Sequence, residues 1–112
     1  MKTHADDPVV VRLSPIVHAP EQLKNLIDRE VNSAVVLDVS DLGFATSMFL
    51  NDLLELRRSI VGRGHQFIIC CSDDRVRGVF NITGLNQVFT IVYSQTEALD
   101  MLKNADQERD CG

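Results

Sequence analysis

Two nearly continuous apolar runs limit what this chain can fold into. They are AVVLDV at residues 34–39 and QFIICC at residues 66–71, and neither alternates between polar and apolar side chains. A strand that is apolar throughout is buried on both faces, as in the centre of a parallel sheet with helices on each side. Because parallel neighbours need a long crossover, usually a helix, the two runs predict an α/β fold.

The segment between the two runs has a helical pattern from about Ser47 to Val61. On a helical wheel its apolar side chains form one broad arc, which we expect to pack on the sheet: Phe49, Leu50, Leu53, Leu54, Leu56, Ile60 and Val61. Met48 falls on the opposite, polar side, next to Ser47 in the first turn. An exposed methionine there is either a contact for a partner or an ordinary isolated apolar residue of the surface.

The same patterns recur along the chain in the order β-α-β-α-β-α-β-α. Strands are expected at residues 9–13, 34–39, 66–71 and 88–92, and helices at 20–31, 47–61, 73–83 and from 94 to about 103. The apolar faces assigned to the first, third and last helices include Val31, then Val76, Val79, Phe80 and Ile82, then Ala98, Leu99 and Leu102. This alternation predicts a mainly parallel sheet of four to five strands with about four helices.

Length and charge predict one acidic globular domain. The chain has 112 residues and a net charge of −5, so it lacks the basic surface that nucleic-acid binding requires. No apolar run approaches the roughly 20 residues of a membrane-spanning helix, and there is no signal-peptide pattern. We expect a cytoplasmic monomer or weak dimer, with a flexible N-terminus at residues 1–8 and a polar tail at residues 105–112.

Motifs for catalysis or for a cofactor are missing from the sequence. The three histidines, His4, His18 and His65, have no neighbour at metal-ligand spacing, and the glycine-rich phosphate-binding motifs do not occur. Cys70 and Cys71 lie in an apolar strand, where thiols usually act as small hydrophobic side chains. We therefore expect no enzymatic activity, no metal ion and no cofactor.

Two stretches carry a resemblance to a known family. One is VVLDV at residues 35–39 followed by LGFATS at 42–47. The other runs from Val76 and Phe80 through ITGL at residues 82–85 to VF at 88–89 and EAL at 97–99. Together they resemble the STAS domain (sulphate transporter and anti-sigma factor antagonist), in particular the small stand-alone bacterial anti-sigma factor antagonists. The resemblance covers residues 9–104, which we take as the domain.

The resemblance implies a protein-binding regulator. In that family a serine at a helix start is phosphorylated by an anti-sigma factor that is also a serine kinase, and phosphorylation releases the bound antagonist. The matching position here is Ser47, and the partner-binding surface is expected to comprise Ala45, Thr46, Ser47, Met48, Asn51 and Asp52. Where the family motif has Asp, a second Ser and Gly, this chain has Thr46, Met48 and Phe49.

Three functions therefore remain open. The first is a switched antagonist, and the second is a non-switching STAS subunit or scaffold in a signalling or transporter complex. The third is a nucleotide or small-anion sensor, which would use the helix N-termini near Ser47 and Asp73. The hydroxyl of Ser47, or that of Thr46, can also simply cap the helix, which is worth about 1 kcal/mol.

Overall fold

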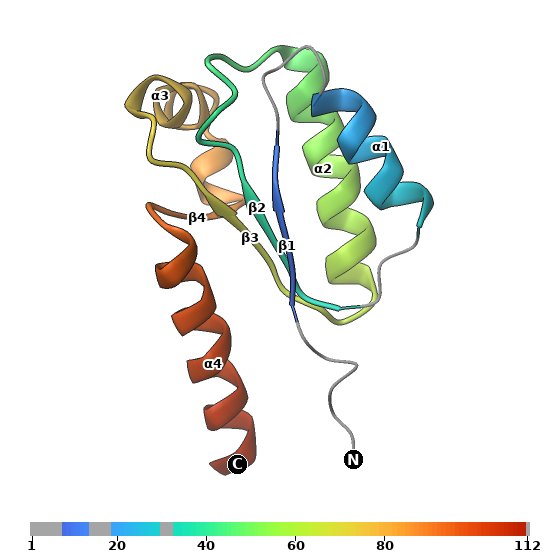
Figure 1. Cartoon of the computed structure of the whole chain (residues 1–112), viewed down its shortest axis with the longest axis vertical. Coiled ribbons are helices and arrows are strands. Elements are labelled where there is room, and N and C mark those ends of the chain that lie inside the picture. The colour runs from blue at the N-terminus through green and yellow to red at the C-terminus, as the bar shows by residue number, and fades with distance from the viewer. Residues whose placement is uncertain (1–7, 14–18, 30–32, 112) are drawn as a thin grey trace.

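Four parallel strands form the centre of the molecule. The computed structural model describes residues 8–13, 19–29 and 33–111 (Figure 1). Its strands are β1 (Val9–Arg12), β2 (Val35–Asp38), β3 (Phe67–Cys70) and β4 (Thr90–Val92), which lie side by side in that order. All three neighbouring pairs are parallel. The α/β class and the alternating order of strands and helices are confirmed.

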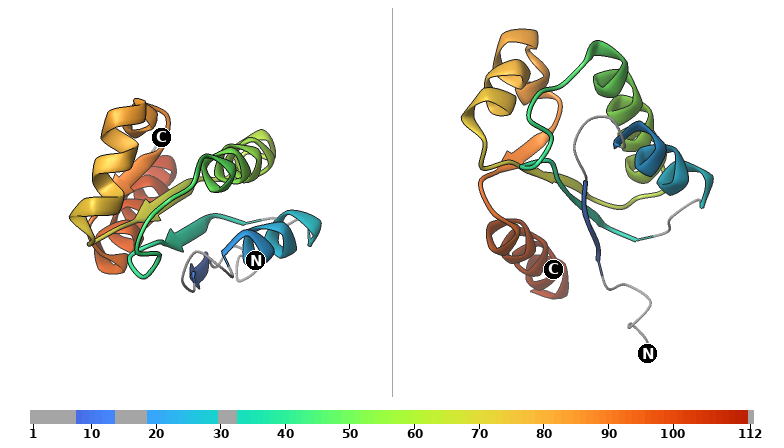
Figure 2. Two further views of the ribbon diagram at one scale, coloured as in Figure 1. Left: turned by 90° about the horizontal axis from the view of Figure 1, so that it is seen from above. Right: turned by 45° about the horizontal axis from the view of Figure 1, so that its top comes forward.

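Helices cover both faces of this sheet. They are α1 (Ala19–Asp28), α2 (Ser47–Gly62), α3 (Asp74–Thr83) and α4 (Gln95–Cys111). The strands are added in one direction, and right-handed crossovers then place the connecting helices on one face. Consistent with this, α1 and α2 lie side by side, while α4, which follows the last strand, packs on the opposite face (Figures 1 and 2).

The side chains of β2 show the burial on two faces that its sequence predicts. Val35 and Leu37 point into the larger core beneath α1, α2 and α3, and Val36 points into a smaller core with Ile68 and Ala98 of α4. All of these side chains are buried, because successive residues of a strand face opposite sides of the sheet. The first apolar run is therefore a central strand.

The predicted apolar arc of α2 is correct except at Val61. Five of its side chains are buried: Phe49, Leu50, Leu53, Leu56 and Ile60. Leu54 is only half-buried and Val61 is 44% exposed. Leu54 still packs against the main core, whereas Val61 lies at the margin of the arc and is open to solvent.

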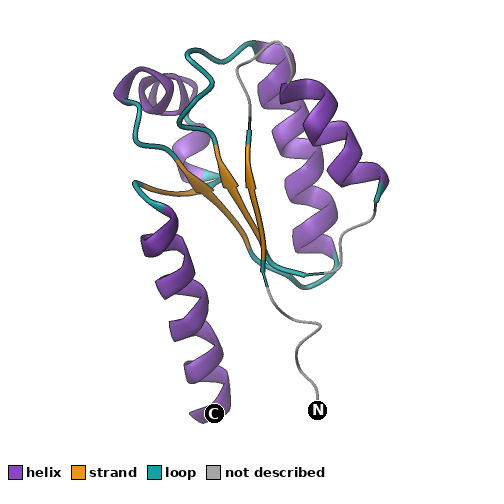
Figure 3. Ribbon diagram, in the orientation of Figure 1, coloured by secondary structure: helices purple, strands orange, loops and turns teal. Residues whose placement is uncertain are grey.

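Several predictions for the C-terminal half are corrected. Ile82 is 88% exposed, because it follows the buried Phe80 by two residues, about 200 degrees around the helix axis, and so falls on the opposite side of α3. The last strand begins only at Thr90, because a short 3-10 turn, η2 (Leu85–Gln87), intervenes (Figure 3). Leu99 is 38% exposed rather than part of a buried face.

The last helix is longer than expected. Helix α4 continues to Cys111 and so includes residues 105–111, which were expected to form a polar tail. Val31 and the expected flexible N-terminus, except for its last residue, lie outside the described residues. Within the described residues, no helix combines the length and the apolar character needed to cross a membrane.

Candidate functional site

The loop between β2 and α2 is anchored at its start by side-chain hydrogen bonds. The backbone N–H of Ser40 donates to Asp38 Oδ1 over 3.0 Å, a local turn typical of aspartate. The hydroxyl oxygen of Ser40 accepts from the backbone N–H of Ser72 over 3.0 Å and so ties this loop to the loop after β3. Leu42 is buried in the main core. The first half of the loop is therefore held to the carboxyl edge of the sheet.

The second half of the loop turns outward. Gly43 has a φ of +84°, in the left-handed region that a residue with a side chain seldom adopts. After this turn Phe44 is 57% exposed, which is unusual for a large aromatic side chain, whereas Ala45 is half-buried against the main core. The turn at Gly43 thus presents Phe44 to solvent just before α2.

Thr46, and not Ser47, caps helix α2. The Thr46 backbone is extended, and its Oγ1 accepts from the backbone N–H of Phe49 over 3.1 Å. Ser47 is the first helical residue and is exposed, and no hydrogen bond of its hydroxyl occurs among the described residues. The first turn of α2 also contains no acidic residue. The N–H groups and partial positive charge at this helix terminus therefore lie beside an exposed hydroxyl.

The remaining residues of the expected docking surface occupy two sides of α2. Met48 is 70% exposed and Asn51 is exposed, while Asp52 is half-buried. Met48, Asp52 and Glu55 are spaced four and three residues apart and so share one stripe of the helix. Ser47 lies about 100 degrees away around the axis. The exposed part of the surface consists of Thr46, Ser47, Met48 and Asn51. Phe44 is an addition that the motif did not indicate.

A buried carboxylate stands behind this loop. Asp38 is 8% exposed, and its Oδ2 accepts from Gln95 Nε2 at the start of α4 over 2.9 Å. Burial raises the pKa of Asp38, but the N–H and hydroxyl of Ser40, the amide of Gln95 and the charge of Arg12 together outweigh it and lower the pKa below its usual value. Asp38 is therefore ionised at neutral pH and joins β2 to α4.

An exposed ion pair lies at the same carboxyl edge of the sheet. Arg12 Nε and Nη2 donate to the two carboxylate oxygens of Asp41 over 2.7 and 3.2 Å. The hydrogen bond and the charge of Asp41 raise the pKa of Arg12. Because both side chains are largely in solvent, the pair contributes little stability and mainly orients the loop.

The two central cysteines are buried in β3 and directly after it. Burial raises the pKa of Cys70 to about 11, and the charges of Asp38 and Glu97 raise it further. Burial also raises the pKa of Cys71, whose Sγ donates to the backbone carbonyl of Asp73 over 3.3 Å. Since the thiolate is the reactive form, neither side chain has the properties of a nucleophile.

Comparisons with known proteins agree with this architecture. The STAS domain family model matches residues 2–98. The chain belongs to the STAS domain family. Its fold is also similar to the crystal structure of a candidate anti-sigma factor antagonist from Thermotoga maritima, with a TM-score of 0.75 and 23% sequence identity. That similarity covers 88% of this chain and 89% of the other. In this STAS domain, the exposed start of α2 is the candidate site.

Proposed function

We propose that this STAS domain is a non-enzymatic regulator of the anti-sigma factor antagonist type, which acts in the cytoplasm and is switched at Ser47. Its partner would be an anti-sigma factor that is also a serine kinase. The observation that carries the proposal is the division of roles at the start of α2. Thr46 caps the helix, so the exposed Ser47 hydroxyl can be modified without loss of the cap.

The surroundings of Ser47 suit a phosphate and suit a partner, but not both at once. A phosphoserine carries about −1.5 to −2 charges and is favoured near a helix N-terminus. Phe44 and Met48, 57% and 70% exposed, lie on either side of Ser47 in the sequence and offer apolar contacts to a docked protein. Because burying a phosphate dianion against an apolar surface is costly, phosphorylation would release such a partner without refolding this domain.

The test uses purified kinases of the anti-sigma type from the source genome, each incubated with this protein and ATP. Intact mass should rise by one phosphate on the wild type and remain unchanged on Ser47→Ala. Ser47→Asp and Met48→Asp should weaken binding of that kinase by roughly tenfold or more. Two variants on α4 are matched controls and should bind the kinase like the wild type. Thr96→Asp places an acidic residue in the first turn of a helix, as Ser47→Asp does, and Met101→Asp replaces an exposed methionine, as Met48→Asp does.

A second candidate function is supported by the residues around Ser47. Thr46 and Phe49 replace the Asp and Gly of the family motif, and Phe49 is fully buried in the main core. A STAS domain that serves as a constant subunit or scaffold would use the same surface without a switch. In that case the wild type gains no phosphate, and Ser47→Ala and Ser47→Asp bind the partner alike.

A further inference from the structure

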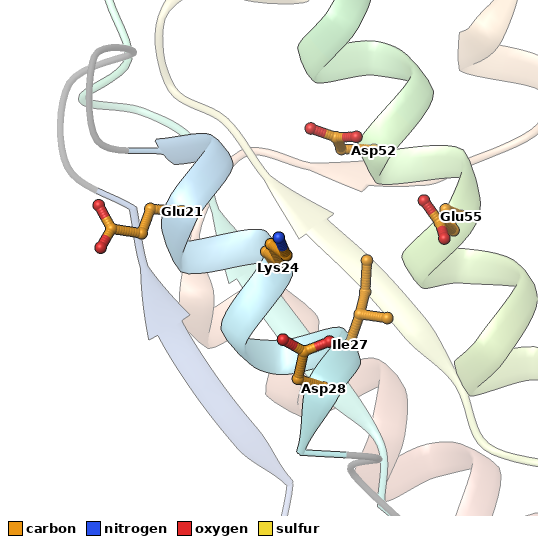
Figure 4. A pocket seen from close by; sticks show the side chains of 6 residues that line it. All are labelled: Glu21, Lys24, Ile27, Asp28, Asp52 and Glu55. Atoms are coloured by element: carbon orange, nitrogen blue, oxygen red, sulfur yellow. The ribbon is translucent and has the colours of Figure 1, made fainter.

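A groove of about 480 Å³ lies between α1 and α2 (Figure 4). Ile27 lies between the two helices, and Asp52 and Glu55 extend from α2 toward α1. The remaining lining residues come from α1: Glu21, Lys24 and Asp28. Since the sequence places the two helices in separate crossovers, only their packing brings these side chains together.

The groove concentrates negative charge. Among the described residues, its lining includes four acidic residues and one lysine, which together carry more than half of the chain's net charge of −5. None of the four carboxylates forms an ion pair with a described residue, whereas Asp41 and Asp73 elsewhere each pair with an arginine. Within the described part of the chain these carboxylates have no ion-pair partner, and a docked protein can supply one.

The spacing of these carboxylates favours a polypeptide over a metal ion. Among the described residues, no three His, Cys, Asp or Glu side chains are close enough together to hold a metal. The groove also has apolar contacts, because Ile27 lies inside it and the exposed Met48 continues the α2 stripe of Asp52 and Glu55 beyond one end. Separate negative charges beside apolar side chains complement an amphipathic segment rich in Lys and Arg.

We propose that the α1–α2 groove is a docking surface for a basic amphipathic segment of a protein partner. The inference deepens the proposed function by stating the chemistry of the partner, and it rests on that function only in taking the partner to be a protein. Ser47 lies about 140 degrees around α2 from Asp52, so the groove and the switch can be tested separately.

The probe is a synthetic amphipathic helical peptide of Leu, Lys and Arg, titrated into the ¹⁵N-labelled full chain. Amide shifts should be confined to α1 and the first half of α2. The double variant Asp52→Asn with Glu55→Gln should bind the peptide roughly three- to tenfold more weakly, as expected for the loss of two partly exposed ion pairs. The control double variant, Asp74→Asn with Asp100→Asn, removes the same charge elsewhere and should bind like the wild type.

Other outcomes would overturn the proposal. Equal weakening in both double variants would mean a general attraction to an acidic protein, and so would shifts spread over all helices. Shifts of Asp52 and Glu55 with Mg²⁺ alone, without peptide binding, would mean a cation site. Ser47→Asp should not weaken binding of the basic peptide. If the peptide binds but no kinase phosphorylates Ser47, only the proposed phosphorylation is refuted. If Ser47 is phosphorylated but the peptide does not bind in the groove, only the groove proposal is refuted.

Discussion

The division of roles between Thr46 and Ser47 yields a prediction about stability. Thr46→Ala removes the hydrogen bond from the Phe49 N–H to Oγ1, a contact of 3.1 Å at an exposed helix terminus. Because little apolar area is lost with it, the loss should be close to that of an N-cap, about 1 kcal/mol. For a domain of this size that lowers the Tm by about 4 °C.

Ser47→Ala is the matched control one residue along. Its hydroxyl makes no hydrogen bond among the described residues, so the free energy of unfolding should change by less than about 0.5 kcal/mol. Thr46→Asp should retain the cap and be at least as stable as the wild type, because Asp ranks above Thr as a cap and its charge suits the helix dipole. Urea unfolding followed by circular dichroism at 222 nm measures all three variants.

The order of the variants in free energy of unfolding shows which of the two hydroxyls caps α2. If Ser47→Ala loses as much stability as Thr46→Ala, the serine hydroxyl is a structural cap. Ser47 would then not be available for modification without a loss of stability. If neither variant loses stability, the helix start gains nothing from its cap, and the exposed terminus would have to be satisfied by water alone.

Three other perturbations follow from the fold. Asp38→Asn should lose roughly 1–3 kcal/mol at pH 7 in urea unfolding. Since folding lowers the pKa of Asp38, the ionised side chain stabilises the fold above its pKa in the unfolded chain, about 4. The difference in free energy of unfolding between wild type and Asp38→Asn should therefore shrink as the pH falls below that value. A difference that stays constant with pH would contradict this. Gly84→Ala should lose about 1 kcal/mol in thermal unfolding, because Gly84 ends α3 at a φ of +78°, and Gly84→Asn should lose less. In a Cys111→Ser background, iodoacetamide should leave Cys70 and Cys71 unmodified by intact mass until urea unfolds the protein, and rapid native labelling would show that they are accessible.

The parts of the fold that local patterns predicted share a physical cause. The two apolar runs are buried on both faces, and the helix between them has one apolar side, so side-chain periodicity alone places them in a covered parallel sheet. Ser94 and Glu97 show a capping-box spacing, and Glu97 N–H does donate to Ser94 Oγ over 3.1 Å. Periodicity failed where a residue sat at the edge of a face, as at Val61, or where a turn delayed a strand, as at η2.

At the candidate site, the family motif placed Ser47 at the first turn of α2 from sequence alone, because the position of a helix start depends on local chemistry. Which neighbouring hydroxyl caps the helix depended on the extended backbone at Thr46, and the exposure of Phe44 depended on the turn at Gly43.

The contacts between distant segments could only come from tertiary structure. Asp38 meets Gln95 across 57 residues, and the charges of α1 meet those of α2 only because both helices pack on one face of the sheet. Short-range periodicity contains no information on such distances. The sequence by itself determined the α/β class, the order of elements and the start of α2. The folded chain decided which side chains share the groove and which hydroxyl, that of Thr46 or that of Ser47, caps α2.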